Sequence, residues 1–98
     1  MRMSYKSLQL LAFLTSDPNR EHAGADMSRE LGIVSGTLYP LLARMELEGL
    51  VSSRWEEGDP KDLGRPRRRF YRITGLGASA AARELAPLQM PPTGGLPA

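Results

Sequence analysis

The hydrophobic pattern of this chain changes its period at Gly49, and no other feature constrains the fold as strongly. The apolar residues just before this glycine follow the i, i+3, i+4, i+7 spacing of a helix with one buried side: Leu38, Leu41, Leu42 and Met45. Residues 50–55 then alternate between two sets of side chains, which is typical of a strand. The sequence therefore predicts a helix that leads through one glycine into a strand.

The ends of this helix are also marked. Ser35 is expected to be its N-cap, because the serine hydroxyl can accept a hydrogen bond from the backbone amides ahead of it. Gly49 is expected to end it. Pro40 conflicts with a helix interior, since proline has no amide hydrogen, unless the first turn begins near Thr37 or the helix bends.

Two further helices are predicted ahead of this segment. Residues 2–16 carry so many apolar side chains that the apolar stripe covers much of the helix circumference. The second helix is expected from about His22 to Leu31, with Gly32 as its C-terminal stop and Gly24 as a weak point. Three helices thus precede the first strand.

A basic hairpin follows. Residues 56–66 are rich in glycine, proline and charge and are expected to form its loop. Residues 68–73 are predicted to be the return strand. Tyr71 and Ile73 share one face of that strand, and Phe70 lies on the other.

A short helix closes the domain. Thr74 is expected to cap a helix over residues 75–86, which Pro87 stops. Residues 87–98 contain four prolines, two glycines and no charge, so they are expected to form a flexible tail. Three helices, a two-stranded basic wing and a short C-terminal helix make a winged helix-turn-helix, a mainly α domain with a small β-hairpin over residues 1–86.

Positive charge is concentrated in the hairpin. The formal net charge of the chain is only +2. Residues 61–72 nevertheless contain six of its 13 lysines and arginines and one acidic residue, so the rest of the chain is net negative. A local cluster of cations on an acidic body favours one surface that meets a polyanion. A solvated, disordered basic loop is the alternative.

Composition argues against several other classes of protein. The chain has no cysteine, which excludes disulfides, thiolate chemistry and cysteine-based zinc sites and fits a reducing cytoplasm. Its single histidine, His22, has no metal-ligand partners at useful spacing, and no phosphate-binding loop is present, so neither an enzyme nor a cofactor is expected. The longest apolar run, residues 10–14, is too short to span a membrane, and the N-terminus lacks the features of a secretory signal.

Two segments resemble the PadR family of bacterial transcriptional regulators. Residues 36–46, with the core Gly-Thr-Leu-Tyr-Pro, resemble the family's recognition helix, and Gly49-Leu50-Val51 its exit into the wing. Residues 64–74 resemble the wing and its return strand. The resemblance implies a cytoplasmic repressor that binds specific double-stranded DNA, with the third helix in the major groove and the wing in the minor groove. In parts of the family it also implies a small-molecule effector.

The resemblance also implies a homodimer. The family's long C-terminal pairing helix is reduced here to about 12 residues, or roughly 18 Å, so we expect the first helix to share the interface. The residues assigned to this interface are Tyr5, Leu8, Leu11 and Leu85. A second departure lies at residues 23–25, where Ala-Gly-Ala stands in place of the His-Gly-Tyr or variant of family members.

Candidate DNA contacts come from the leading end of the third helix and from the wing. The assigned residues are Ser35, Gly36, Thr37, Tyr39, Arg44, Lys61, Arg65, Arg67 and Arg68. Small residues allow a helix N-terminus to approach a phosphate closely. Arginine suits both bidentate phosphate contacts and the narrow, negative minor groove.

Several of these assignments have structural alternatives. Ser35 can be only a cap, and Tyr39 only a half-buried ring. Arg44 can bind phosphate or pair with Glu48 four residues further along the helix. Arg69 is as consistent with a solvated strand face as with a DNA contact.

Trp55 and the apolar first helix leave two further questions. Trp55 is the single tryptophan and is expected to pack on the hairpin near Phe70, with a ligand contact as the alternative. Winged helices also serve as protein-interaction adaptors, and the first helix offers an apolar face for another chain. A monomer without salt-sensitive DNA binding would favour that second function.

Overall fold

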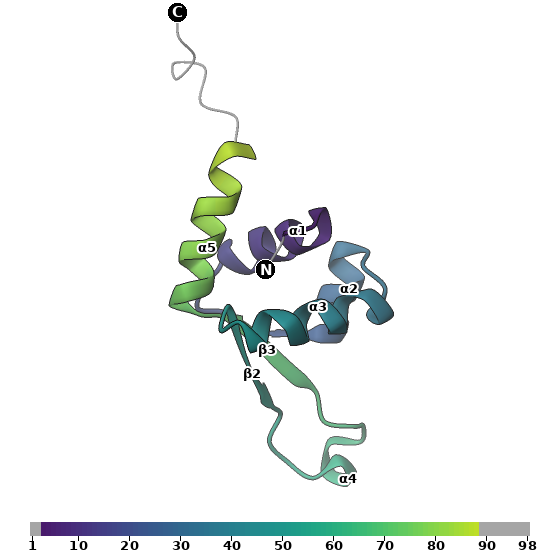
Figure 1. Ribbon diagram of the computed structural model, residues 1–98. Helices are drawn as coiled ribbons and strands as arrows, with labels where there is room; N and C mark the ends of the chain where they lie inside the picture. The colour runs from purple at the N-terminus through teal and green to yellow at the C-terminus, as the bar shows by residue number, and fades with distance from the viewer. Residues whose placement is uncertain (1–2, 89–98) are drawn as a thin grey trace, which may run out of the picture.

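The computed structural model describes residues 3–88 and is a mainly helical domain with a small antiparallel sheet (Figure 1). Its elements are α1 (Tyr5–Thr15), β1 (His22–Ala23), α2 (Gly24–Leu31), α3 (Ser35–Leu47), β2 (Val51–Trp55), α4 (Pro60–Leu63), β3 (Arg69–Ile73), α5 (Gly75–Leu85) and a 3-10 turn (Ala86–Leu88). The winged helix-turn-helix predicted from the sequence is confirmed. Of the predicted tail, only Pro87 and Leu88 are described, and they belong to the 3-10 turn.

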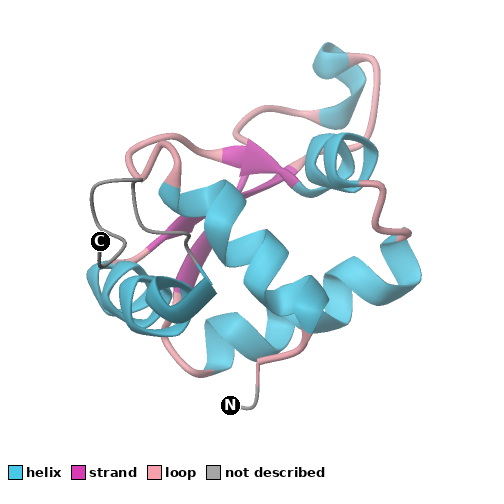
Figure 2. Cartoon of the chain, turned by 90° about the horizontal axis from the view of Figure 1, so that it is seen from above, coloured by secondary structure: helices cyan, strands magenta, loops and turns pink. Residues whose placement is uncertain are grey.

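The helices and the hairpin lie at different ends of the molecule. Helix α1 packs on α5, and α2 packs on α3. The β2–β3 hairpin projects from this helical body, and α4 lies at its tip, far from α5 (Figure 1). From above, helices lie to either side of the short strands (Figure 2). The hairpin is therefore a true wing.

The sheet has three strands, in the order β1-β3-β2. Strands β2 and β3 pair with each other, with Val51 opposite Ile73 and Ser53 opposite Tyr71. The strand faces predicted from the alternation are therefore confirmed. The third strand is a correction, because His22 and the residue after it were expected to begin a helix. They are instead extended and pair with the free edge of β3. That pairing satisfies backbone groups of β3 which a helix would leave without partners.

Two further helix starts differ from the predictions. Helix α1 begins at Tyr5 rather than residue 2, because the Ser4 hydroxyl accepts a hydrogen bond from the Ser7 amide (3.1 Å) and caps it. Ser35 is not a cap. The N-cap of α3 is Val34, whose carbonyl accepts the Thr37 amide (2.9 Å), so the helix begins one residue earlier and contains Ser35.

The remaining helix boundaries follow the sequence more closely. Gly32 and Gly49 have φ of 67° and 76° after α2 and α3, a conformation that glycine adopts without steric cost. Pro40 lies inside α3, in its second turn, because the helix starts two residues before Thr37. Proline cannot donate to the carbonyl of Gly36, so the second turn has one hydrogen bond fewer than a regular helix.

The core forms between α1, α2, α3 and α5 and the inner face of the sheet, whereas α4 contributes no buried residue. The predicted buried stripe of α3 is confirmed, since Leu38, Leu42 and Met45 are fully buried and Leu41 packs partly against the cluster. Leu11 is also fully buried. It therefore belongs to the core of one subunit, and its assignment to a dimer interface was wrong, because residues of other elements cover this part of α1.

The start of α5 is tightly fitted to the end of α3. The Thr74 hydroxyl accepts the Gly77 amide (3.0 Å) and donates to the Gly49 carbonyl (2.6 Å), so the predicted cap is confirmed. A Cβ at Gly77 would lie 1.9 Å from the Leu50 carbonyl oxygen. Glycine is needed there because no larger residue fits against the backbone.

Candidate nucleic-acid interface

The leading end of α3 presents small polar residues to solvent. Ser35 and Gly36 are exposed and Thr37 is half-buried. Arg44, two turns further along, is also exposed. The first amides of a helix carry partial positive charge. This end of α3 can therefore approach an anion with its backbone.

Tyr39 lies between the second and third helices. Its ring packs directly on Gly24, since a Cβ built on that glycine would be 2.6 Å from the Tyr39 Cε1 atom. The side chain is still 40% exposed. Tyr39 is thus a packed ring that is still partly exposed, so packing on α2 and contact with DNA do not exclude each other.

The wing is held in shape by its own polar groups. The Asp59 carboxylate accepts the Lys61 amide (2.9 Å) and caps α4, and Gly64, with φ of 71°, ends that helix. Lys61 itself is exposed on this short helix. The loop expected between residues 56 and 66 is therefore an ordered tip that carries a cation.

Arg65 does not point outward as an unpaired cation. Its Nη1 and Nη2 atoms donate to the two carboxylate oxygens of Glu56 at 2.6 and 2.9 Å. Glu56 also accepts the Arg68 amide at 3.1 Å. The Arg65 guanidinium is the main reason why the pKa of Glu56 falls to about 2. Arg65 thus holds the base of the wing tip together, so its guanidinium is not an unpaired cation that is free to contact DNA.

Two other arginines remain available at the wing. Arg67 donates through Nε to the Gly58 carbonyl (2.6 Å), which leaves its Nη groups for other partners. Arg68 takes part in the Glu56 contact through its backbone, and its side chain is exposed. Neither of these side chains, nor that of Lys61, takes part in an ion pair among the described residues, so all three can meet a polyanion.

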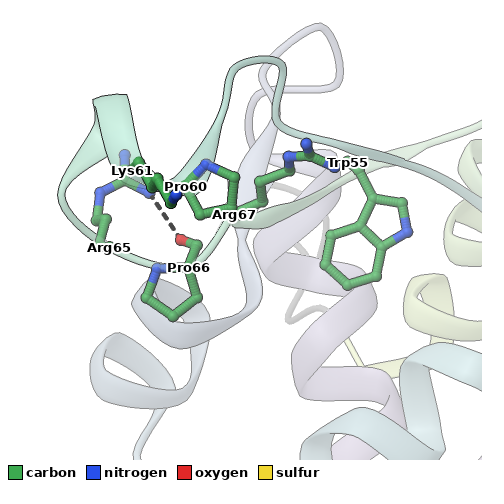
Figure 3. A pocket seen from close by; sticks show the side chains of 6 residues that line it. All are labelled: Trp55, Pro60, Lys61, Arg65, Pro66 and Arg67. Atoms are coloured by element: carbon green, nitrogen blue, oxygen red, sulfur yellow. Dashed lines mark hydrogen bonds between the residues drawn. The ribbon is translucent and has the colours of Figure 1, made fainter.

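A groove runs between α3 and the wing. We call it the helix-wing groove, and it is lined by Ala23, Gly24, Ala25, Tyr39, Trp55, Arg65, Pro66, Arg67, Arg68, Arg69 and Tyr71. A second hollow, the wing-tip groove, is lined by Trp55, Pro60, Lys61, Arg65, Pro66 and Arg67 (Figure 3). Residues that are up to 48 positions apart in the chain, from Ala23 to Tyr71, thus line one surface that carries the arginines of the wing.

The comparisons with known proteins identify this arrangement. A model of the transcriptional regulator PadR-like family matches residues 20–83. The chain belongs to this family. No curated protein matches it.

Two solved structures show how closely the PadR-like fold is reproduced. A PadR family transcriptional regulator from Eggerthella lenta is 25% identical, with a TM-score of 0.68, over 85% of this chain and 73% of that one. A PadR-like transcription factor from Bacteroides fragilis is 28% identical, with a TM-score of 0.69, over 83% and 77%. Fold and family together place the chain among DNA-binding transcriptional regulators.

One connection in this PadR-like domain was not foreseen. Arg69 donates to the Ser53 hydroxyl (3.1 Å), lies 3.7 Å from a Glu46 carboxylate oxygen of α3, and covers the Trp55 ring at 4.9 Å. Arg69 therefore ties the wing to the recognition helix rather than standing as a solvated strand residue. Glu46 also accepts from Ser53 (2.6 Å).

The surroundings of Trp55 differ from the prediction. Trp55 is opposite Arg69 in the sheet, so the adjacent Phe70 lies on the other face. There Phe70 packs under Arg54 at 5.0 Å, and Arg54 binds Glu21 at 2.7 and 2.9 Å. Packing of Trp55 near Phe70 was therefore wrong. The alternation along β3 carried the information, because neighbours on a strand point to opposite faces.

Glu56 is the other residue that sequence reasoning missed. A glutamate at the start of a basic loop, nine positions before Arg65, is the signal that could have found it.

His22 packs on Phe13, with ring centroids 4.7 Å apart, and burial lowers the pKa of its imidazole. Residues 3–88 contain no cluster of side chains suited to a metal ion, and none of their helices has the length and apolar character to cross a bilayer.

Proposed function

We propose that this protein is a cytoplasmic repressor that binds specific double-stranded DNA as a homodimer. The observation that supports the proposal most directly is the helix-wing groove, in which Tyr39 of α3 and Arg67 and Arg68 of the wing line one surface. A duplex met by α3 in its major groove would meet the wing in the neighbouring minor groove.

The division of labour follows from exposure and pairing. Ser35, Gly36 and Thr37 bring the helix N-terminus to the DNA, and Tyr39 reaches a phosphate or a base edge with its hydroxyl. Arg44, which lies further along α3, contacts the DNA backbone. In the wing, the cations Lys61, Arg67 and Arg68 contact the DNA strands. Arg65 instead holds the shape of the wing tip through Glu56.

The proposed dimer uses the outer faces of α1 and α5. Tyr5 is 79% exposed, and Leu8 and Leu85 are half-buried. These helices pack on each other within one subunit, so a second subunit would extend an existing apolar surface. Two subunits related by a two-fold axis would read half-sites about 34 Å apart.

The decisive experiment begins with selection of genomic DNA fragments by the purified protein, together with its mass in solution. Affinity for a selected duplex is then measured over a series of salt concentrations. Removal of two phosphate contacts by Arg67→Ala with Arg68→Ala should weaken binding and reduce the salt slope by about 2. Arg20→Ala, in the loop between α1 and β1 and outside both grooves, removes one exposed cation as a control.

Two results would overturn the proposal. An unchanged slope in the double variant would remove the wing from the interface. A monomer that binds no duplex in a salt-sensitive way would favour a protein-interaction adaptor instead.

A further inference from the structure

We propose that Trp55 is a DNA contact, and that its indole packs on a deoxyribose of the strand that passes between the recognition helix and the wing. The inference rests on the proposed function and adds to it an apolar contact at the centre of a cationic surface. Neither the charge pattern nor the family resemblance assigned such a role to Trp55.

The first support is the continuity of the two grooves. The helix-wing groove and the wing-tip groove share Trp55, Arg65, Pro66 and Arg67. One continues to Tyr39 on α3, and the other continues to Lys61 on α4. The DNA strand between a major groove that contains α3 and a minor groove that contains the wing has to run along this line. Trp55 lies at the middle of the line.

The shape of the surface favours a polymer over a small ligand. The wing-tip groove measures about 710 Å³ and the helix-wing groove about 470 Å³, and neither is an enclosed cavity. Small-molecule sites typically bury most of their ligand. An open, continuous groove can instead hold a chain that enters at one end and leaves at the other.

The indole is accessible and held in place. Trp55 is 58% exposed. The Arg69 guanidinium covers part of its ring, and Arg69 is itself bound to Ser53 and close to Glu46. Because these contacts fix the ring before DNA arrives, little conformational entropy is lost when a sugar packs on it.

The charges around the ring complement a phosphodiester strand. Lys61 and Arg67 line the wing-tip groove together with Trp55, with Arg67 next to the indole and Lys61 toward the other end (Figure 3). Of the acidic side chains of the wing, Glu56 holds Arg65 and Asp59 caps α4, while Glu57 and Asp62 line neither groove. A strand has a phosphate on each side of every sugar, which matches an apolar ring flanked by cations.

The test uses the fact that Trp55 is the single tryptophan of the chain. Its fluorescence should change when a selected duplex binds and should saturate at the same concentration as binding. Trp55→Ala should weaken binding about tenfold at every salt concentration, because stacking on an aromatic ring carries no counterion release. The salt slope should stay that of the wild type, whereas Arg67→Ala should reduce it by about 1.

Two further variants separate a contact from a general loss of structure. Trp55→Phe keeps a ring under Arg69 and should recover part of the affinity. Leu47→Ala, which truncates another exposed apolar residue (89% exposed) at the last position of α3 and outside both grooves, should leave affinity unchanged. Melting temperatures of all variants should stay close to that of the wild type, since neither side chain is in the core.

The outcomes distinguish this inference from the proposed function. Unchanged affinity in Trp55→Ala, with a loss in the Arg67 and Arg68 double variant, would overturn the inference and leave the function standing. Absence of any duplex binding by the wild type would overturn both. A saturable fluorescence change with benzoate alone, in competition with DNA, would show that the groove is a small-molecule site instead.

Discussion

The ring of Tyr39 occupies the space that a side chain at Gly24 would need, with only 2.6 Å between its Cε1 atom and a Cβ built on that glycine. Gly24 begins α2 and Tyr39 lies in the second turn of α3. The absence of a side chain on one helix thus sets the position of a candidate DNA contact on the other.

Gly24→Ala should therefore displace Tyr39 and weaken DNA binding by roughly tenfold, the effect of about 1.4 kcal/mol. Stability should change less, because the far end of an exposed side chain can move away. A double-mutant cycle checks the coupling: in a Tyr39→Ala background, Gly24→Ala should have little further effect on affinity. Equal losses in both backgrounds would show that Gly24 acts independently of Tyr39.

Gly77→Ala should be strongly destabilising. The new methyl would meet the Leu50 carbonyl oxygen at 1.9 Å, and neither the backbone nor α5 can move without disturbing the cap at Thr74. We expect a loss of about 3 kcal/mol, measured by chemical denaturation.

Gly75→Ala is the matched control in the same helix. No atom lies within 4 Å of a Cβ at this position. The variant should be neutral or more stable by up to about 1 kcal/mol, because alanine restricts the unfolded chain. Similar losses in the two variants would contradict the close contact described at Gly77.

The Glu56–Arg65 pair predicts a pH effect. The pKa of the Glu56 carboxyl is about 2 in the folded protein against an ordinary 4.5, and its hydrogen bonds with Arg65 are the largest cause. A carboxylate with a lowered folded-state pKa stabilises the fold fully above pH 4.5, and this stabilisation is lost as the pH falls toward 2. Glu56→Gln should flatten the pH dependence of stability over this interval.

Direct titration of the Glu56 carboxyl by NMR provides the second measurement. In Arg65→Ala the pKa should rise toward 4.5, and it should stop below that value because the Arg68 amide still donates to the carboxylate. A titration unaffected by the loss of Arg65 would remove this arginine as the strut of the wing tip.

Thr74→Val should cost about 1–2 kcal/mol of stability. Valine has nearly the same shape, but it cannot accept the Gly77 amide or donate to the Gly49 carbonyl. Thr74→Ser keeps the hydroxyl and should stay within about 0.5 kcal/mol of the wild type. Equal unfolding midpoints for the valine and serine variants would show that the cap contributes nothing.

Local signals in the sequence were enough for most elements of the domain. The change of period at Gly49, the stop at Gly32 and the cap at Thr74 all depend on residues within one or two turns. The inward faces of Leu38 and Tyr71 followed from the helical and strand periods in the same way. These features depend on backbone geometry near the residue itself, so a linear pattern can reveal them.

What the sequence by itself determined is thus the order of the four main helices and the two wing strands, their inner faces and the concentration of cations in the wing. Tertiary structure alone decided that residues 22–23 form a strand on β3, that Leu11 is covered within one subunit, and that Arg65 is paired with Glu56. The physical reason is common to all three. Each depends on a partner that folding brings close from another element or from across a loop, and spacing along the chain does not encode which groups will meet.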